Sequence, residues 1–157
     1  MTVRKRKIGK RALEWLKRNL QGYEVTLTKI IPRDIKHKSD AVGEEIFYLL
    51  YVREELEKDF QKYGWDGELN HFWQRLQELD QILIAQREAI VNAYTPEYYR
   101  YQRERLKIPR VYWWWYLDEL ESVELREWVM AGSQRSWGCP RELPIERRGN
   151  ETQVGNE

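Results

Sequence analysis

Glu68 and His71 are the pair of side chains in this chain whose types and spacing most resemble metal chemistry. A Glu-x-x-His pair places both ligands on one helix face, as in helical bundles that bind two iron ions. Such a site needs a second pair and two further carboxylates, but the other histidine, His37, has no Glu three residues before it. We therefore expect no metal and no other cofactor, and we interpret Glu68 as stabilising the first turn of a helix.

Nucleophilic and phosphoryl-transfer chemistry also lack a motif in the sequence. Cys139 is the single cysteine, and no base lies near it in the chain. A single cysteine excludes an internal disulfide, which fits a reducing compartment. No Gly-rich loop ending in Gly-Lys-Ser/Thr occurs. We expect a protein that is not an enzyme; a metal-dependent helical-bundle enzyme and a nucleotide hydrolase are the alternatives that we rank last.

Binding chemistry is better represented, because residues 98–110 interleave tyrosines with basic side chains. Single-stranded nucleic acid is bound by stacking on aromatic rings while cations follow the backbone. No recognised nucleic-acid-binding fold accompanies the pattern, and a helix that packs Tyr98, Tyr101 and Leu106 would explain it too. The basic candidates for binding nucleic acid or another partner come from this segment and the N-terminus: Arg4, Lys5, Arg6, Lys7, Arg100, Arg103, Arg105, Lys107 and Arg110.

A run of five aromatic residues, 112–116, adds two further candidates. The chain has 8 Trp and 10 Tyr but only 3 Phe, so most of its large rings carry a polar group suited to half-wet surfaces. If 110–131 is one helix, Trp113 and Tyr116 fall on its core stripe. Trp114 and Trp115 then form a surplus that needs either a partner or cover from the N-terminal segment.

Charge is segregated although the formal net charge is only +1. Residues 1–18 carry eight Lys and Arg against Glu14, residues 98–110 carry five against Glu104, and residues 118–127 carry five acids against Arg126. Such segregation is typical of nucleic-acid or acidic-partner surfaces, and equally of solvated helix faces with internal charge matching. No apolar run approaches the ~20 residues that span a membrane, and the basic N-terminus lacks the apolar stretch of a signal peptide. We expect a cytoplasmic protein with no membrane contact.

The elements that must position these residues follow from periodicity. Residues 9–20 predict a short amphipathic helix that stops at Gly22. Residues 23–31 alternate as in a strand, which Pro32 would end, and residues 33–42 predict a polar loop.

Residues 44–63 and 68–94 have apolar side chains at spacings of three and four, which predicts two long helices with a coiled-coil-like seam. The short link 64–67 predicts that they fold back as an antiparallel hairpin. Folding about this link pairs Phe60 with Phe72 and Arg53 with Glu78.

Thr95 and Pro96 predict the start of a helix that reaches about Lys107, and a further helix is expected over 110–131. The predicted fold is mainly α: the long hairpin with shorter packed helices and one or two short strands near 23–31. A single helical domain should cover 1–137, with an α/β segment over 1–43, and residues 138–157 predict a disordered tail.

Residues 8–46 bear a family resemblance. The segment Ile8–Leu16 leads through the expected strand into Thr28–Asp34, which contains Ile31-Pro32-Arg33, and Ala41, Gly43 and Ile46 follow. This arrangement resembles the C-terminal part of the ParA/MinD group of partition ATPases. The resemblance implies a loop at Pro32 and Arg33 near a nucleotide base. It also implies that the family's phosphate loop and catalytic aspartate would precede Met1, as in a truncated relative.

Taken together, the sequence predicts a non-catalytic helical interaction or scaffold protein that acts in a nucleic-acid-associated complex. The expected partner is another protein or a second copy of the chain. Direct binding of single-stranded or non-specific nucleic acid through the basic-aromatic segments is the alternative.

Overall fold

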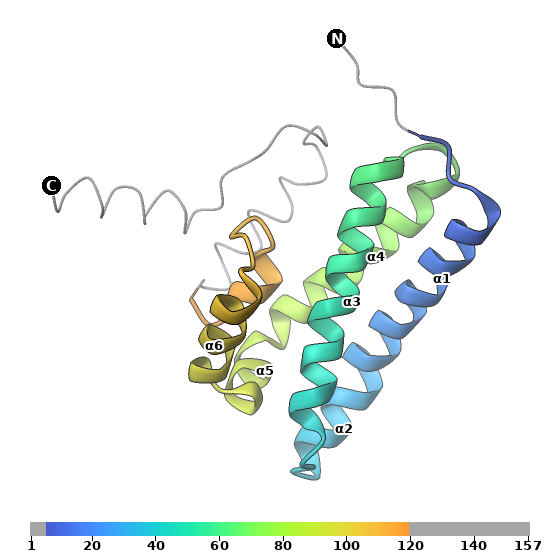
Figure 1. Cartoon of the computed structure of the whole chain (residues 1–157). Coiled ribbons are helices and arrows are strands. Elements are labelled where there is room, and N and C mark those ends of the chain that lie inside the picture. Colours follow the sequence, from blue (N-terminus) through green and yellow to red (C-terminus); the bar gives the residue numbers. More distant parts are fainter. Residues whose placement is uncertain (1–5, 120–157) are drawn as a thin grey trace, which may run out of the picture. The chain divides into compact units, whose positions relative to one another are not determined.

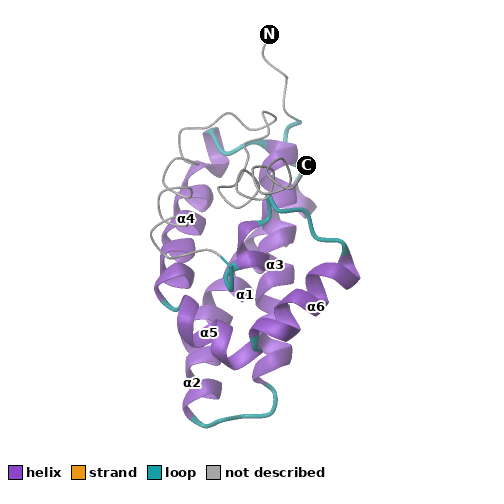
Figure 2. Ribbon diagram, turned by 90° about the vertical axis from the view of Figure 1, so that its left-hand side faces the viewer, coloured by secondary structure: helices purple, strands orange, loops and turns teal. Residues whose placement is uncertain are grey.

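The computed structural model describes residues 6–119, which are mainly α-helical and contain no strand (Figure 2). Arg4, Lys5 and the predicted tail 138–157 lie outside the described residues. No helix in the described range is long and apolar enough to cross a membrane. The chain divides into two compact units, Met1–Leu83 and Ile84–Glu157, and each is treated separately below. The predicted single domain over 1–137 stays a prediction.

In the first unit, the predicted strand 23–31 is wrong. Helix α1 (Lys10–Val25) continues through a π-helical turn (Thr26–Ile30) into α2 (Ile31–Lys36), so neither Gly22 nor Pro32 ends the helical path. A helical stripe explains this outcome: Leu16, Leu20, Tyr23, Leu27 and Ile31 follow spacings of three and four and are all buried. The alternation over 23–31 is a short pattern within this longer helical one.

Pro32 accounts for the π-helical turn. Proline has no N–H to donate to the carbonyl of Thr28 four residues earlier, and its ring clashes with that carbonyl in a regular α-helix. In the structure the Ile31 N–H instead reaches the carbonyl of Thr26, five residues back. The wider turn therefore lets one helical path pass through a proline with local adjustment.

Helix α3 (Val42–Tyr63) returns beside α1 in the opposite direction, and the two pack together (Figure 1). Gly22 of α1 marks a close approach: a Cβ placed there would lie 2.6 Å from the Tyr48 hydroxyl oxygen. Their shared core contains Leu16, Leu20, Leu49 and Leu56, all buried.

Helix α4 (Asn70–Ala85) contacts α3 through two pairs of side chains. The Phe60 and Trp73 rings lie 5.2 Å apart edge to face, and Arg53 is bonded to Asp80. The predicted pairs, Phe60 with Phe72 and Arg53 with Glu78, are therefore displaced by one and two residues. The reason is which side chains face inward: Trp73 and Asp80 are buried, whereas Glu78 is exposed and bonds to Arg75 on its own helix.

The predicted helix 68–94 is interrupted. A 3-10 turn (Gly67–Leu69) precedes α4, and Gln86 separates α4 from α5 (Arg87–Tyr94). Helix α6 (Pro96–Leu106) begins as predicted, with the Thr95 hydroxyl accepting a hydrogen bond from the Tyr98 N–H at 3.2 Å.

The predicted helix 110–131 is wrong over its described part. Residues 110–112 form a turn, and Trp113–Tyr116 form a 3-10 turn rather than an α-helix. The rest of that predicted helix lies outside the described residues.

Candidate interaction surface

Three large aromatic side chains are exposed on the helices of the first unit. Trp15 of α1 is 57% exposed, and Tyr48 and Tyr51 of α3 are 43% and 49% exposed. We call these three residues the aromatic seam. Most aromatics of this size are buried in a folded domain, so a group of exposed ones is a feature that calls for a ligand or a partner.

The geometry of α1 and α3 places the three residues of the seam on one side of the contact between the two helices. The Tyr48 hydroxyl lies over Gly22 of α1. Trp15 precedes Gly22 by seven residues, two helical turns, and so lies on the same stripe of α1. Tyr51 follows Tyr48 by one turn in the direction that leads back toward Trp15, because the helices run in opposite directions (Figure 1).

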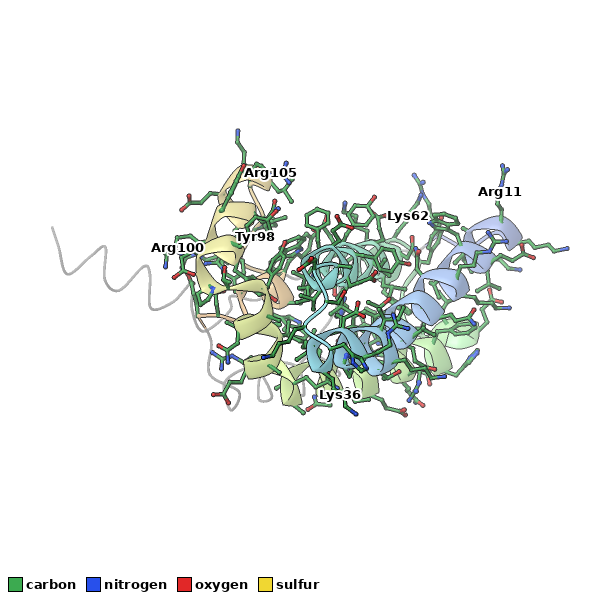
Figure 3. The ribbon with its side chains drawn as sticks, turned by 90° about the horizontal axis from the view of Figure 1, so that it is seen from below. Arg11, Lys36, Lys62, Tyr98, Arg100 and Arg105 are labelled. Carbon is green, nitrogen blue, oxygen red and sulfur yellow. The ribbon has the colours of Figure 1, made fainter. Side chains whose placement is uncertain are left out.

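The two sides of the seam carry opposite charge. On α1, Arg11 and Arg18 flank Trp15 at one turn on either side and are exposed. On α3, Glu44 and Glu55 lie one turn beyond the two tyrosines, Glu44 exposed and Glu55 half-buried. Figure 3 shows the Arg11 side chain extending away from its helix, as does that of Lys62 at the far end of α3.

A second charged group, around Arg53, lies inside the first unit. Its guanidinium donates to both Asp80 oxygens at 2.9 and 3.0 Å and to Glu57 at 3.0 Å. The Tyr23 hydroxyl donates to Asp80 at 2.8 Å. Burial alone would lower the pKa of Arg53, but the Asp80 and Glu57 carboxylates outweigh it and raise that pKa. All four side chains are buried, so the group holds α1, α3 and α4 together and presents nothing to a ligand.

In the second unit, the structure separates the basic residues predicted to form one binding patch. Arg103 is only 5% exposed. It donates to the Trp115 carbonyl at 3.0 Å and to Glu119 at 3.0 Å, and it is paired with Asp118. The guanidinium also lies 4.7 Å from the centre of the Tyr116 ring. Internal charge matching, one of the two interpretations of the charge pattern, therefore holds for Arg103.

Trp114 and Trp115, the predicted surplus, are buried at 0% and 1% exposure. Trp114 stacks with Tyr112 at 5.0 Å and meets Trp113 edge to face at 5.7 Å. All four residues of Trp113–Tyr116 are buried. Because a 3-10 turn spaces consecutive side chains about 120° apart, this turn is covered on every side, which a single helical stripe does not predict. These two candidates are not surface residues.

The remaining basic candidates are on or near the surface. Arg100, Arg105 and Lys107 are exposed on α6 or just after it, and Arg6 and Lys7 are exposed before α1, whereas Arg110 is half-buried. Figure 3 shows Tyr98, Arg100 and Arg105 extending from α6. Gln102 joins two of them, donating to the Tyr98 hydroxyl at 2.9 Å and accepting from Arg105 at 2.6 Å.

The Glu-x-x-His pair, Glu68 and His71, does not form a metal site within the described residues. Glu68 is exposed in the 3-10 turn and His71 is exposed at the start of α4. No cluster of three or more His, Cys, Asp and Glu side chains that could hold a metal ion occurs between residues 6 and 119.

Sequence reasoning missed the seam because Tyr48 and Tyr51 were not considered as surface residues. They follow Ile46 and Leu49 of the buried stripe by two positions, which is 200° around a helix. The same two-residue offset could have identified both as outward-facing.

No protein-family model, curated protein or solved structure matches this chain, so its function has to be inferred from the residues themselves. The resemblance of residues 8–46 to the ParA/MinD group stays a prediction. Pro32 and Arg33, which the resemblance placed in a loop, lie in α2.

Proposed function

We propose that this protein is a non-catalytic helical scaffold protein that associates with a second copy of itself through the aromatic seam. The observation that carries the proposal is the exposure of Trp15, Tyr48 and Tyr51 on the two packed helices α1 and α3. The proposal includes an antiparallel hairpin of α3 and α4 that supports the seam. The Phe60–Trp73 and Arg53–Asp80 contacts support that arrangement.

A second copy is the partner that the charges favour. The α1 side of the seam is basic through Arg11 and Arg18, and the α3 side offers the exposed Glu44, whereas Glu55 already contacts Lys58 at 3.8 Å. A two-fold axis that lies in the interface, parallel to α1 and α3, sets α1 of each copy against α3 of the other. Such a two-fold interface is complementary to itself, in charge as well as in the aromatic residues at its centre.

The size of the seam predicts the strength of this association. Each aromatic side chain can bury roughly 150–250 Å², and the three are about half exposed, so each copy offers on the order of 300 Å² of aromatic surface. A stable interface of standard size buries about 800 Å² per partner. We therefore expect a weak, concentration-dependent dimer rather than an obligate one.

Sedimentation velocity over a wide concentration range tests the proposal. The chain should shift from monomer to dimer with rising concentration, and Tyr51→Ala should move that shift to much higher concentration. Tyr101→Ala is the matched control, because Tyr101 of α6 is 50% exposed and lies outside the seam. A chain that stays monomeric throughout, or a Tyr101→Ala variant as impaired as Tyr51→Ala, contradicts the proposal.

Binding of single-stranded nucleic acid through α6 is a second candidate. Tyr98 and Tyr101 are exposed with ring centres 5.9 Å apart, beside Arg100 and Arg105, which suits stacking of bases. It ranks lower because the pairing of Arg103 with Asp118 removes one cation from the surface. Two exposed acids, Glu97 and Glu104, further dilute the positive charge on the same helix.

A further inference from the structure

The helical path over residues 10–36 has an outer face that begins beside the aromatic seam, at Arg11 and Arg18, and continues beyond the seam to Lys36. With α1, the π-helical turn and α2 joined end to end, this path runs for roughly 40 Å at 1.5 Å per residue. Arg11 and Lys36 project from near its two ends (Figure 3). No role has yet been argued for the part of this path beyond Gly22.

Positive charge is concentrated on this path and its flanks. Residues 6–38 contain ten Lys and Arg against three acids, although the whole chain has a formal net charge of only +1. Glu24 is bonded to Arg75 of α4 at 2.7 Å, and Asp34 is buried, with one oxygen accepting a hydrogen bond from Arg33 of this path at 3.3 Å. Glu14 is the one exposed acid between residues 6 and 38.

The basic side chains point away from the core. Arg18, Lys29 and Arg33 follow the buried residues Leu16, Leu27 and Ile31 by two positions each, which is 200° around the helix. Lys36 follows the buried Asp34 in the same way. All four are exposed, and the Arg33 side chain is 64% exposed despite its contact with Asp34.

We propose that this outer face binds the phosphate backbone of nucleic acid, without reading its sequence. A row of cations on successive helical turns matches a polyanion that carries one charge per ~1.7 Å of duplex axis. Lys29, Arg33 and Lys36 form its densest part, one after another on successive turns. The proposal is independent of self-association, since these three residues lie beyond the seam.

Two other classes of partner fit the face less well. A helix that lies in a membrane surface must insert its apolar side, but Leu16, Leu20, Tyr23, Leu27 and Ile31 are buried in the first unit. A protein interface would need an apolar, aromatic centre and is typically poor in lysine. Trp15 is the one large exposed aromatic on this path, and it belongs to the seam.

Fluorescence anisotropy of the full chain with a labelled 20-base-pair DNA duplex, measured across a salt series, tests the proposal. Binding should weaken steeply with salt and depend little on sequence. The triple variant Lys29→Gln, Arg33→Gln, Lys36→Gln should flatten the logarithmic salt slope by roughly 2–3, because each neutralised phosphate contributes about 0.9 to that slope. Its affinity near 0.1 M salt should fall on the order of tenfold or more. Circular dichroism should show unchanged helicity, because all three side chains are exposed.

The matched control is a second triple variant, Arg100→Gln, Arg105→Gln, Lys107→Gln, because it removes the same charge from exposed positions of the second unit. It should leave the salt slope nearly unchanged. Equal losses of DNA affinity in both triple variants would mean that only net charge matters. A loss confined to the α6 variant would assign DNA binding to α6. Either result overturns the proposal. Binding to phosphatidylserine vesicles but not to DNA would overturn it in favour of a membrane. Tyr51→Ala should bind DNA like the unmodified chain, so failure of self-association and failure of nucleic-acid binding can be told apart.

Discussion

Arg53 and Arg103 show that the partners of an arginine, rather than its type, decide its role in this molecule. Both are buried, and each is neutralised by two carboxylates: Asp80 and Glu57 for Arg53, Asp118 and Glu119 for Arg103. Exposed arginines such as Arg33 and Arg100 remain available for ligands. Only Arg53 could be recognised from the sequence as an interior residue, because it interrupts an apolar stripe.

Replacing Arg53 should be strongly destabilising. Arg53→Ala leaves Asp80 and Glu57 buried without their cation, which typically costs about 3–5 kcal/mol. Arg75→Ala is the matched control, since Arg75 pairs with Glu24 and Glu78 at the surface, where such pairs contribute about 1 kcal/mol or less. Urea denaturation measures both. A loss for Arg53→Ala no larger than for Arg75→Ala would show that the buried group contributes little.

Asp59 predicts a dependence of stability on pH. Burial, and to a smaller extent the nearby Glu55 carboxylate, raise the pKa of Asp59 to about 6 against the opposing effect of Lys62. The unfolded pKa of an Asp is about 3.9, so between about pH 4 and 6 the folded chain holds the proton more tightly. Stability due to this group therefore falls as pH rises through that window, and the penalty is complete above it.

Asp59→Asn should accordingly stabilise the chain at pH 7.5 and have almost no effect at pH 4. Two pKa units correspond to about 2.7 kcal/mol, and solvent screening of this half-buried group reduces the expected gain to about 1 kcal/mol. Thermal denaturation at the two pH values measures the difference from the unmodified chain. Asp40→Asn, at an exposed loop position, controls for the loss of a charge. If Asp59→Asn raised the stability equally at both pH values, the raised pKa of Asp59 would not be its cause.

At the scale of elements, α1 and α3 approach each other closely at one glycine, Gly22. Alanine stabilises a helix relative to glycine by roughly 1 kcal/mol, so Gly43→Ala in α3, where a Cβ meets nothing within 4 Å, should stabilise the fold. Gly22→Ala should give no such stabilisation, because its Cβ would lie only 2.6 Å from the Tyr48 hydroxyl oxygen. The ring carbon that bears this oxygen is 3.6 Å away, which is an ordinary contact.

Tyr48→Phe should therefore restore most of the missing stabilisation in the Gly22→Ala background. The four chains of this double-mutant cycle, compared by urea denaturation, isolate the coupling between the two positions. If Gly22→Ala alone stabilises as much as Gly43→Ala, the close approach at this position is not restrictive.

For the whole molecule, charge segregation should be visible without any partner. The formal net charge is +1 at pH 7, while residues 6–38 alone hold ten basic residues against three acids, so the rest of the chain is acidic. We expect the protein to bind both cation- and anion-exchange resins at low salt and pH 7. The Lys29, Arg33, Lys36 triple variant should elute earlier from the cation exchanger and later from the anion exchanger. Passage through both resins would show that the charges are evenly mixed on the surface.

The sequence by itself determined the elements that depend on local chemistry. The mainly helical character, the helix 44–63 and the start of α6 at Thr95 and Pro96 all follow from apolar spacing and capping within a few residues. These features need no distant partner, because the interactions that define them are made along one stretch of chain.

Only the tertiary structure decided the features that depend on distant residues. Residues 23–31 are helical because the stripe from Leu16 to Ile31 packs against α3, although the local pattern also fits a strand. Arg103 is interior because Asp118 and Glu119 fold back to it from fifteen and sixteen residues away. The physical reason is the same in both cases: burial and charge pairing are non-local, and a short segment compatible with two conformations adopts the one that its neighbours in space stabilise.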